Sequence, residues 1–591
     1  MNQQDIGKEW KVESDSIPAA SDSSMTTMDR PSNPEFFSKE ENSDSGASAI
    51  KQPTKDEDSG QDELSKQASK PGDHVPEDER VYLTGFELVA AMAAIVLVTF
   101  LMLLDLSIIS TAIPTITNHF HSLADVGWYA SSYQIANACL QPLTGKVYTH
   151  FNTKWSYLGF FLLFELGSLL CAISTSSKML IIARAVAGMG GSGMMNGSIT
   201  IVAASVPLHK SPAMIGILMG LSNIGVVAGP LLGGALTEKV SWRWCFYINL
   251  PVGGLVAFIM AFIRVPEPLI KPPIRQAAVT ILNEFDLIGF ALFTPAAIQL
   301  LLALSYGSGG NFAWGSATII GLFCGSGATF IVFLLWEHHK GPKAMVPLKM
   351  IAKRKVWSSC LLMMGLAGTV IISSYYLPIY FQSVHNDSPI RSGVSMLPLM
   401  LGQVVFSVVS GLMIGRVGYY MPFAIFGGAL AAIGGGLLSS MTPNTSTGKW
   451  VGYQLMSGAG RGFAFQVPII AIQNSLPYQE ISMGMAILVF CQTMAGAVII
   501  TIANVIFDTG LNSTLVKYAP NANAKAVVAA GATGFRSVVS EADIPGVIRA
   551  YAKSFDYTSY LNAGVAAVIF LAAFGTGWVD IRKKKKPLEK V

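Results

Sequence analysis

Four charged side chains lie inside long apolar stretches of this chain, where packing alone does not explain them. They are Asp105, Glu165, Arg184 and Arg461. A charge inside hydrocarbon is costly, so an ionisable residue in such a place is a functional candidate by default. A carboxyl group in a low-dielectric environment holds its proton more readily than in water. These residues therefore point to the binding and release of protons within a membrane.

We expect the two acids and the two arginines to have different roles. Asp105 lies in the outer half of the first apolar segment and is the leading candidate for a proton carrier, with structural pairing as the alternative. Glu165 lies in the middle of the third segment, where a structural hydrogen bond competes with proton coupling. Arg184 is expected close to the inner end of the fourth segment, where it would exchange partners with a protonating carboxylate. Arg461, with glycine on both sides, would balance a buried acid or bind an anionic substrate.

Polar and aromatic side chains on the same segments are candidates for lining a substrate cavity. Most intramembrane Asn and Gln residues connect helices by hydrogen bonds, which is the alternative at each position. A pocket rich in Phe, Met and Tyr with few charges suits a large, mostly apolar solute. The substrate-binding candidates are Tyr133, Gln134, Asn137, Asn196, Asn223, Arg461, Phe463 and Gln466, with Gln403 and Gln492 as further lining residues.

Composition and segment length indicate an all-α integral membrane protein. Of the 591 residues, 51% are hydrophobic and only 13% are charged, and the mean hydropathy is +0.48. From residue 86 onward, apolar segments of about 20 residues recur, each long enough to cross a bilayer. We predict fourteen spans, at 86–112, 125–144, 155–174, 179–204, 212–236, 244–264, 285–304, 315–337, 356–381, 391–414, 420–440, 450–473, 481–506 and 560–579.

Charge and sequons indicate which side of the membrane each loop faces. An even number of spans puts both termini on one side, and with the termini cytosolic the inner loops carry thirteen basic residues against five outside. This distribution follows the positive-inside rule. Glycosylation sequons at Asn386, Asn444 and Asn512 all fall on predicted outer loops. We therefore expect both termini in the cytosol and glycans on the opposite side.

The predicted spans divide the chain into five parts. Residues 1–85 form a cytosolic tail that is strongly acidic and has the composition of a disordered segment. Residues 86–264 form an N-terminal six-helix half, and 265–355 hold two inserted helices with inner loops. Residues 356–579 form a C-terminal six-helix half with a long outer loop at 507–559, which is expected to be an amphipathic surface segment or irregular. Residues 580–591 form a basic cytosolic tail.

The stretch MGLSNIGVVAGPLLGG, at 219–234, carries five glycines and a proline within an apolar segment. Gly225, Gly229 and Gly233 follow one another at four-residue spacing, which gives a bare stripe on a helix. Small residues allow helices in a bilayer to approach closely. With Pro230 and Gly234, this stripe is predicted to act as a packing hinge.

The predicted halves resemble each other at an offset of eight spans, as expected for two related six-helix units. Span four reads GMGGSGMMNGSI and span twelve reads GAGRGFAFQVPI. The loop that follows span two contains Gly145 and Lys154, and the corresponding loop after span ten contains Gly411 and Arg416. We predict that these four residues take part in the conformational change.

These motifs resemble the major facilitator superfamily, and within it the fourteen-span drug:proton antiporters of fungi. The glycine stretch is similar to the antiporter motif G-x-x-x-G-P-x-x-G-G. LLDLSIISTAIP resembles the first-span signature, RAVAGMGGSG the arginine motif of span four, and WRWCFYINLPVGG the entry to span six. The resemblance implies the major facilitator fold, with two six-helix halves plus two inserted central helices. It also implies that span five packs against the other half and seals the inner ends in one state.

One loop departs from the family pattern G-x-x-x-D-R-x-G-R-K after span two. Thr149 stands in place of the aspartate, His150 in place of the arginine and Asn152 in place of the glycine. Gly145 and Lys154 match. The charge relay that the resemblance would imply for this loop therefore cannot be carried over.

The leading hypothesis is proton-coupled efflux of hydrophobic small molecules, such as mycotoxins, secondary metabolites or antifungal drugs, across the plasma membrane. An importer or vacuolar transporter of siderophores or basic amino acids is the alternative in the same fold, and a non-transporting receptor or scaffold is the alternative of another class. No nucleophile motif, metal cluster or cofactor-binding motif indicates an enzyme. We expect a monomer that contacts lipid, substrate and protons, with no cofactor, no metal and no nucleic acid.

Overall fold

The computed structural model describes residues 82–120, 126–267, 284–308 and 312–582, and the single residues 271, 276, 279 and 281. The acidic segment 1–81 and the basic residues 583–591 lie outside the described residues, so the expectations for the two tails are not addressed. Within the described ranges the chain is helical and has no strand apart from one isolated bridge between Tyr419 and Asp580.

The helices form two groups that follow each other in the sequence. The N-terminal group comprises α1 (Gly85–Phe120), α2 (Val126–His150), α3 (Thr153–Ala172), α4 (Ser177–Ser205), α5 (Ser211–Ser222), α6 (Ile224–Lys239), α7 (Trp244–Tyr247) and α8 (Asn249–Phe262). The C-terminal group comprises α13 (Arg354–Val384), α14 (Pro389–Ser395), α15 (Leu397–Val417), α16 (Met421–Leu438), α17 (Thr447–Ala464), α18 (Val467–Ser475), α19 (Tyr478–Tyr518), α20 (Ala524–Val538) and α21 (Ile544–Ala573).

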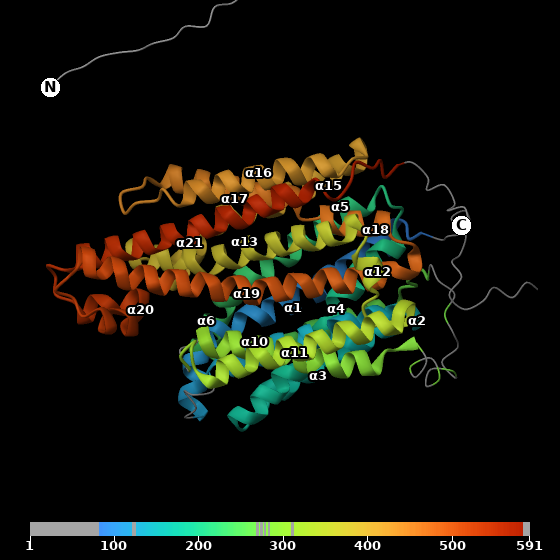
Figure 1. Cartoon of the computed structure of the whole chain (residues 1–591), viewed down its shortest axis with the longest axis horizontal. Coiled ribbons are helices and arrows are strands. Elements are labelled where there is room, and N and C mark those ends of the chain that lie inside the picture. Colours follow the sequence, from blue (N-terminus) through green and yellow to red (C-terminus); the bar gives the residue numbers. More distant parts are fainter. Residues whose placement is uncertain are drawn as a thin grey trace, which may run out of the picture. The chain divides into compact units, whose positions relative to one another are not determined.

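Between these groups lie two long helices, α10 (Leu287–Ser308) and α11 (Ala317–Lys340), followed by a 3-10 turn (Gly341–Lys343) and the short α12 (Leu348–Ile351). They pack against each other, and α10 also packs against α2 and α19 (Figure 1). The Asp286 carboxylate holds the start of the pair, because it accepts hydrogen bonds from the Gly289 backbone and from Nε1 of Trp336 on α11, at 2.9 and 2.8 Å. This arrangement agrees with the two predicted inserted helices.

Eleven helices among the described residues are long and apolar enough to cross a membrane. Three places where spans were predicted are not among them: α2, α4 and the α5–α6 pair. The count of fourteen stays a prediction, whereas the all-helical membrane architecture is confirmed. A bilayer favours this architecture because helices satisfy their backbone hydrogen bonds internally.

Four predicted spans are each built from two consecutive helices. The fifth divides at Asn223 into α5 and α6, the sixth into α7 and α8, the tenth into α14 and α15, and the twelfth into α17 and α18. Asn223 donates from its amide to the Met219 carbonyl at 2.6 Å. Asparagine competes with helical backbone bonds in this way, which is why it favours helix ends over helix interiors.

Small residues set the close packing within each group. A Cβ on Gly167 of α3 would meet the backbone of Ala187 on α4, and a Cβ on Gly460 of α17 would meet Ala431 on α16. Gly428 packs in the same way against the backbone of Phe570 on α21. Close backbone contact is the main source of attraction between helices in lipid, where apolar burial gives no advantage.

The region expected as an outer loop at 507–559 is mostly helical. α19 continues to Tyr518, α21 begins at Ile544, and α20 lies between them. The hydropathy pattern ended the span of α19 too early and began the span of α21 too late, because polar residues such as Asp508 and Asp556 lie on helices that extend beyond the apolar segment. Asn512 therefore lies on α19 rather than on a loop.

Candidate functional site

A buried ion pair joins the first and fourth predicted spans. The Asp105 carboxylate on α1 accepts a hydrogen bond from Nη1 of Arg184 on α4 at 2.5 Å, and each side chain is only 1% exposed. Burying two charges is costly unless they pair and their remaining hydrogen-bonding groups are satisfied. The pair is therefore held by its surroundings, and removal of either charge would leave the other unpaired.

The surroundings of Arg184 supply those further contacts from α2 and α7. Its Nε donates to the Tyr129 carbonyl at 3.1 Å. Its guanidinium carbon lies 4.7 Å from the centre of the Tyr133 ring and 5.9 Å from that of Phe246. Aromatic faces attract a guanidinium, and this attraction is strongest where water is excluded.

The position of Arg184 corrects one expectation from the sequence. We call the end of the bundle where α1 begins the inner end, following the predicted topology. Ser205, at the far end of α4, lies at that inner end, because its carbonyl accepts from the Leu83 backbone at 3.0 Å. Arg184 lies near the opposite, outer end of α4, at the depth of Asp105. The predicted topology itself implies this position, because a fourth span that starts from a cytosolic N-terminus runs from the outer end to the inner end and Arg184 lies near its start.

The polar network continues from Asp105 to α8 and α3. Asn249 donates to Oδ1 of Asp105 at 3.5 Å and to Ser168 at 3.1 Å. One turn before Ser168, Glu165 lies beside Gly253 of α8, one turn after Asn249, which donates to Asp105. Neither Glu165 oxygen has a hydrogen-bond partner among the described residues. The structural hydrogen bond that was the alternative for Glu165 is therefore not seen there.

A polar stripe on α2 lies next to this network. Tyr133, Asn137 and Gln141 are spaced by four residues on one helix face and are all buried. The Tyr133 hydroxyl, Oδ1 of Asn137 and both side-chain polar atoms of Gln141 have no hydrogen-bond partner in the described part of the chain. Buried polar atoms are normally paired. Sequence reasoning missed Gln141, although its spacing from two candidates could have identified it.

The other N-terminal lining candidates have more ordinary surroundings. Asn196 donates to Thr144 at 3.0 Å and so connects α4 with α2, while its Oδ1 has no partner. Asn223 is half-buried at the break between α5 and α6. Gln134 is exposed on α2, on a different face from Tyr133. The structure thus brings Tyr133 to the ion pair and leaves Gln134 away from it.

The C-terminal candidates lie around α17 and α18. Arg461 is buried and donates from Nη1 to the Thr369 carbonyl on α13 at 3.2 Å. Phe463 packs between Phe406 and Phe426, with ring centres 5.1 and 5.2 Å away. Gln466 donates to Ser410 at 2.6 Å and to the Ser407 carbonyl, which joins it to α15. Only Arg461 among these three is a buried charge.

The glycine stripe packs on α1 and not on the other group of helices. Cβ atoms on Gly225 and Gly233 would each lie 2.5 Å from an α1 carbonyl, of Phe100 and Ile108 respectively. Gly229 meets the Ser107 side chain, whereas nothing lies within 4 Å of a Cβ on Gly234. Pro230 lies in α6 in the same segment. The bare stripe therefore holds α6 against the helix that carries Asp105.

The chain's relatives fit this architecture. Residues 95–500 match the sequence profile described as the Major Facilitator Superfamily. This chain belongs to the major facilitator superfamily. It is 52% identical over 512 residues to MFS-type transporter pigP of Monascus ruber, covering 87% of this chain and 90% of the relative. It is 50% identical over 517 residues to Efflux pump mlcE of Penicillium citrinum, covering 86% and 93%.

Solved structures of the superfamily share the fold at low sequence identity. The human organic anion transporter MFSD10 aligns with a TM-score of 0.51 at 14% identity, covering 83% of this chain and all of that one. The proton:xylose symporter XylE aligns with a TM-score of 0.51 at 15% identity, covering 80% and 94%. These likenesses support the fold alone. Together with the family match, they confirm the resemblance that the sequence motifs indicated.

The two halves of this superfamily member meet at the inner end. A Cβ on Gly145 of α2 would lie 2.9 Å from Cα of Met483 on α19, and one on Gly411 of α15 would lie 2.6 Å from the Pro212 carbonyl on α5. Ser211 donates across the same interface to Gln473 at 2.9 Å. Two of the predicted hinge glycines, Gly145 and Gly411, therefore lie where one half contacts the other.

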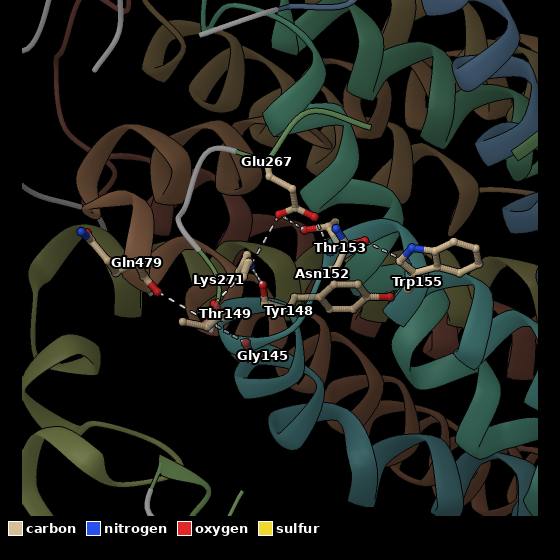
Figure 2. Close-up of polar contacts among 9 residues, drawn as sticks. All are labelled: Gly145, Tyr148, Thr149, Asn152, Thr153, Trp155, Glu267, Lys271 and Gln479. Carbon is tan, nitrogen blue, oxygen red and sulfur yellow. Dashed lines mark hydrogen bonds and ion pairs between the residues drawn. The ribbon is translucent and has the colours of Figure 1, made fainter. Parts of the chain in front are cut away.

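The loop between α2 and α3 is held by the segment that follows α8, as Figure 2 shows. Glu267 accepts from the backbone and hydroxyl of Thr153, at 2.5 and 3.0 Å, at the start of α3. Lys271 donates to the carbonyls of Tyr148 and Thr149, at 2.5 and 3.1 Å, at the end of α2. Their charged groups lie 3.7 Å apart. We call Glu267 and Lys271 the loop clamp.

The loop clamp places its charges where helix ends favour them. An anion is stabilised at a helix N-terminus and a cation at a C-terminus. Burial raises the pKa of the Glu267 carboxyl, and the neighbouring Lys271 and Thr153 oppose that rise. Burial likewise lowers the pKa of the Lys271 ammonium against the attraction of Glu267. Sequence reasoning missed both residues, because they lie more than a hundred positions from the loop that they hold.

The family-pattern departures in this loop also have local roles. Asn152 caps α3 by accepting from the Trp155 backbone at 3.1 Å. Thr149 donates to the Gly145 carbonyl at 2.8 Å and to the Gln479 carbonyl of the other half at 3.5 Å (Figure 2). Neutral hydrogen bonds replace the missing charges within the loop, and the loop clamp supplies charges from outside it.

The remaining candidates lie on the surface. Lys154 donates to the Ala261 carbonyl at the end of α8 at 2.6 Å. The Arg416 side chain is exposed, and its carbonyl accepts from Arg582 at 2.9 Å. The predicted glycan acceptors Asn386 and Asn444 are exposed on loops, whereas Asn512 is exposed on α19 and donates to the Asp508 carbonyl.

Proposed function

We propose that this chain is a proton-coupled exporter of hydrophobic small molecules, such as mycotoxins, secondary metabolites or antifungal drugs. The observation that carries the proposal is the buried pair of Asp105 and Arg184, with the unpaired carboxylate of Glu165 close by. A transporter that exchanges protons for substrate needs a carboxyl group whose ionisation alters a buried contact. In support, several relatives carry the printed name efflux pump.

The coupling step follows from the contacts of the pair. Protonation of Asp105 removes the negative charge that faces Arg184, while Arg184 keeps the Tyr129 carbonyl and the Tyr133 ring. The guanidinium then turns toward another acceptor, and the Glu165 carboxylate, which has no donor among the described residues, is the candidate. Because α1, α3 and α4 supply these groups, a change of partner alters how these helices pack.

Alternating access in this proposal uses the contact between the halves. We assign the described arrangement to the state with access from the outer side, because the inner ends are in contact through α2–α19 and α5–α15. Asp105, on the outer half of α1, would then exchange a proton with the outer solution, while Arg184 keeps its charge. Buried polar atoms without partners on α2, from Tyr133 to Gln141, would contact substrate as the halves rearrange.

The proposal includes the orientation and location of the chain. Both termini are placed in the cytosol of a cell that carries the protein in its plasma membrane, with Asn386 and Asn444 as the glycan acceptors on the outer side. The protein acts as a monomer in contact with lipid. Uptake, or transport into a vacuole, remains the second candidate in the same fold, because the ion pair would serve either direction.

The test is the accumulation of labelled hydrophobic compounds in pump-depleted yeast that expresses the chain, with and without a protonophore. We expect lower accumulation than in the empty strain, restored by the protonophore. Accumulation that is higher than in the empty strain and collapses with the protonophore would instead establish uptake. Accumulation that is unaffected by expression for every compound would support a receptor or scaffold.

The loop clamp is predicted to support closure of the inner end. Replacing Lys271 with methionine removes the charged donor from the last carbonyls of α2, and a hydrogen bond to a charged group contributes about 1.5–3 kcal/mol. We expect Lys271→Met to lower the initial efflux rate roughly tenfold, with normal protein levels. Lys340→Met is the matched control, because Lys340 is an exposed lysine in the last turn of α11. An equal rate in wild type and Lys271→Met would contradict this role.

A further inference from the structure

Arg461 is a buried cation to which the structure gives no anion. Its side chain, 2% exposed, extends from α17 to the Thr369 carbonyl on α13. Among the ion pairs of the described residues, none includes Arg461. This contrasts with Arg184, the other fully buried arginine, which has Asp105. Of the two roles expected for Arg461, balancing a buried acid therefore has no support.

The Arg461 guanidinium also has donor capacity left over. Nε has no hydrogen-bond partner among the described residues, and a guanidinium offers five donors in a fixed planar fork. A buried charge without a counter-charge costs several kcal/mol more than a paired one. The carbonyl of Thr369 is a neutral acceptor and does not neutralise it. A negative ligand at this position would supply the missing counter-charge.

Further buried polar groups lie on α17 and on α21, which packs against α13. Gln454 lies two turns before Arg461 on the same face of α17, is fully buried, and has no hydrogen-bond partner at either polar atom. Asn562 of α21 donates to Ser373 at 3.4 Å, one turn along α13 from Thr369. Arg461 and Gln454 thus lie on α17 and Asn562 on α21, and both helices donate to α13, at the Thr369 carbonyl and at Ser373.

We propose that Arg461 binds the negative charge of the transported molecule, so that the substrates of this chain are apolar molecules with one anionic group, most simply a carboxylate. The proposal rests on the proposed export function and makes its substrate class specific. A carboxylate matches the planar fork of a guanidinium, with two parallel hydrogen bonds. The amide donor of Gln454 is placed to bind a polar group further along the same substrate.

The experiment measures binding apart from transport. The purified full-length chain in detergent is titrated with 1-pyrenebutanoate and with 1-pyrenebutanol, which share the ring system and chain but differ in charge. A third titration uses a phosphatidylglycerol, because an anionic lipid headgroup presents the same charge to a guanidinium. Binding is followed as the rise in the unfolding temperature, in wild type, Arg461→Gln and Arg461→Lys.

We expect 1-pyrenebutanoate to stabilise wild type at concentrations about tenfold lower than 1-pyrenebutanol. Arg461→Gln should remove this preference, and Arg461→Lys should keep part of it, because lysine retains the charge but not the fork. Lys449→Gln is the matched control, since it removes one positive charge from an exposed position on the same helix. It should behave as wild type.

Three results would overturn the proposal. The first is equal stabilisation by the acid and the alcohol in wild type, and the second is an unchanged preference in Arg461→Gln. The third is stabilisation that depends on Arg461 with phosphatidylglycerol but not with 1-pyrenebutanoate, which would make this a lipid site. Failure of the proposed export function is seen separately, because cells would then show no accumulation change that responds to a protonophore for any compound, neutral ones included.

Discussion

Replacing Asp105 with asparagine is expected to abolish uphill efflux, with the protonophore-sensitive rate falling about tenfold or more. Asparagine keeps the shape of the side chain but carries no exchangeable proton, so substrate movement is no longer tied to the proton gradient. The measurement is the initial rate of export from preloaded cells at several external pH values. In wild type the rate should rise as the external pH falls, whereas in Asp105→Asn it should be low and independent of pH.

The buried arginine makes a second variant necessary. Removing one partner of a buried ion pair costs about 3–5 kcal/mol, so Asp105→Asn alone could reduce folding. The double variant Asp105→Asn/Arg184→Gln removes both charges and should recover protein level and unfolding temperature without recovering pH-dependent export. Glu165→Gln is the companion test of the second carboxyl group. If Asp105→Asn kept pH-dependent export and Glu165→Gln lost it, Glu165 would be the proton carrier.

Replacing Gly145 with leucine is expected to stop transport by keeping the inner ends of the two halves apart. The first added carbon would lie 2.9 Å from Cα of Met483 and 3.1 Å from Cβ of Ala486, both on α19 of the other half. Real Cβ atoms almost never approach so closely, and backbone cannot move aside as a flexible side chain does. We expect the efflux rate to fall about tenfold or more, with normal protein levels because packing within each half is untouched.

A reporter cysteine tests the cause of that loss. Ser211 is buried at the contact between the halves, where it donates to Gln473. In a cysteine-free background, in inside-out vesicles, Ser211→Cys should react with a membrane-impermeant thiol reagent faster when Gly145→Leu is present. Gly159→Leu is the matched control, because nothing lies within 4 Å of a Cβ at Gly159. Wild-type export by Gly145→Leu would show that the α2–α19 contact does not need to close.

Much of the architecture of this protein could be predicted from its sequence by considering one segment at a time. The apolar segments, the intramembrane charges and the family motifs all depend on local composition, because the cost of placing a residue in hydrocarbon is a property of that residue and its segment. For this reason the all-helical membrane architecture and the superfamily were predicted correctly. The end of α19 and the start of α21 were not, because both helices extend beyond their apolar segments through polar residues such as Asp508 and Asp556.

The contacts between side chains on different helices could not be predicted in the same way. Such a contact depends on how the two helices are rotated and at what depth they meet. Asp105 and Arg184 are 79 residues apart, and only their packing shows that they form a pair at the outer half of the bundle. Glu267 lies 114 residues from Thr153, on a segment whose composition gives no sign that it holds another loop.

The two buried arginines, Arg184 and Arg461, show most clearly what the sequence determines and what depends on the tertiary structure. In the sequence they are equivalent, since each is a cation inside an apolar segment, and hydrophobic patterning determines no more than that. The tertiary structure distinguishes them, because α1 brings a carboxylate to Arg184 whereas α13 brings only a backbone carbonyl to Arg461. Electrostatic energy in a low-dielectric interior depends on the distance between charges, and that distance is set by helix packing alone.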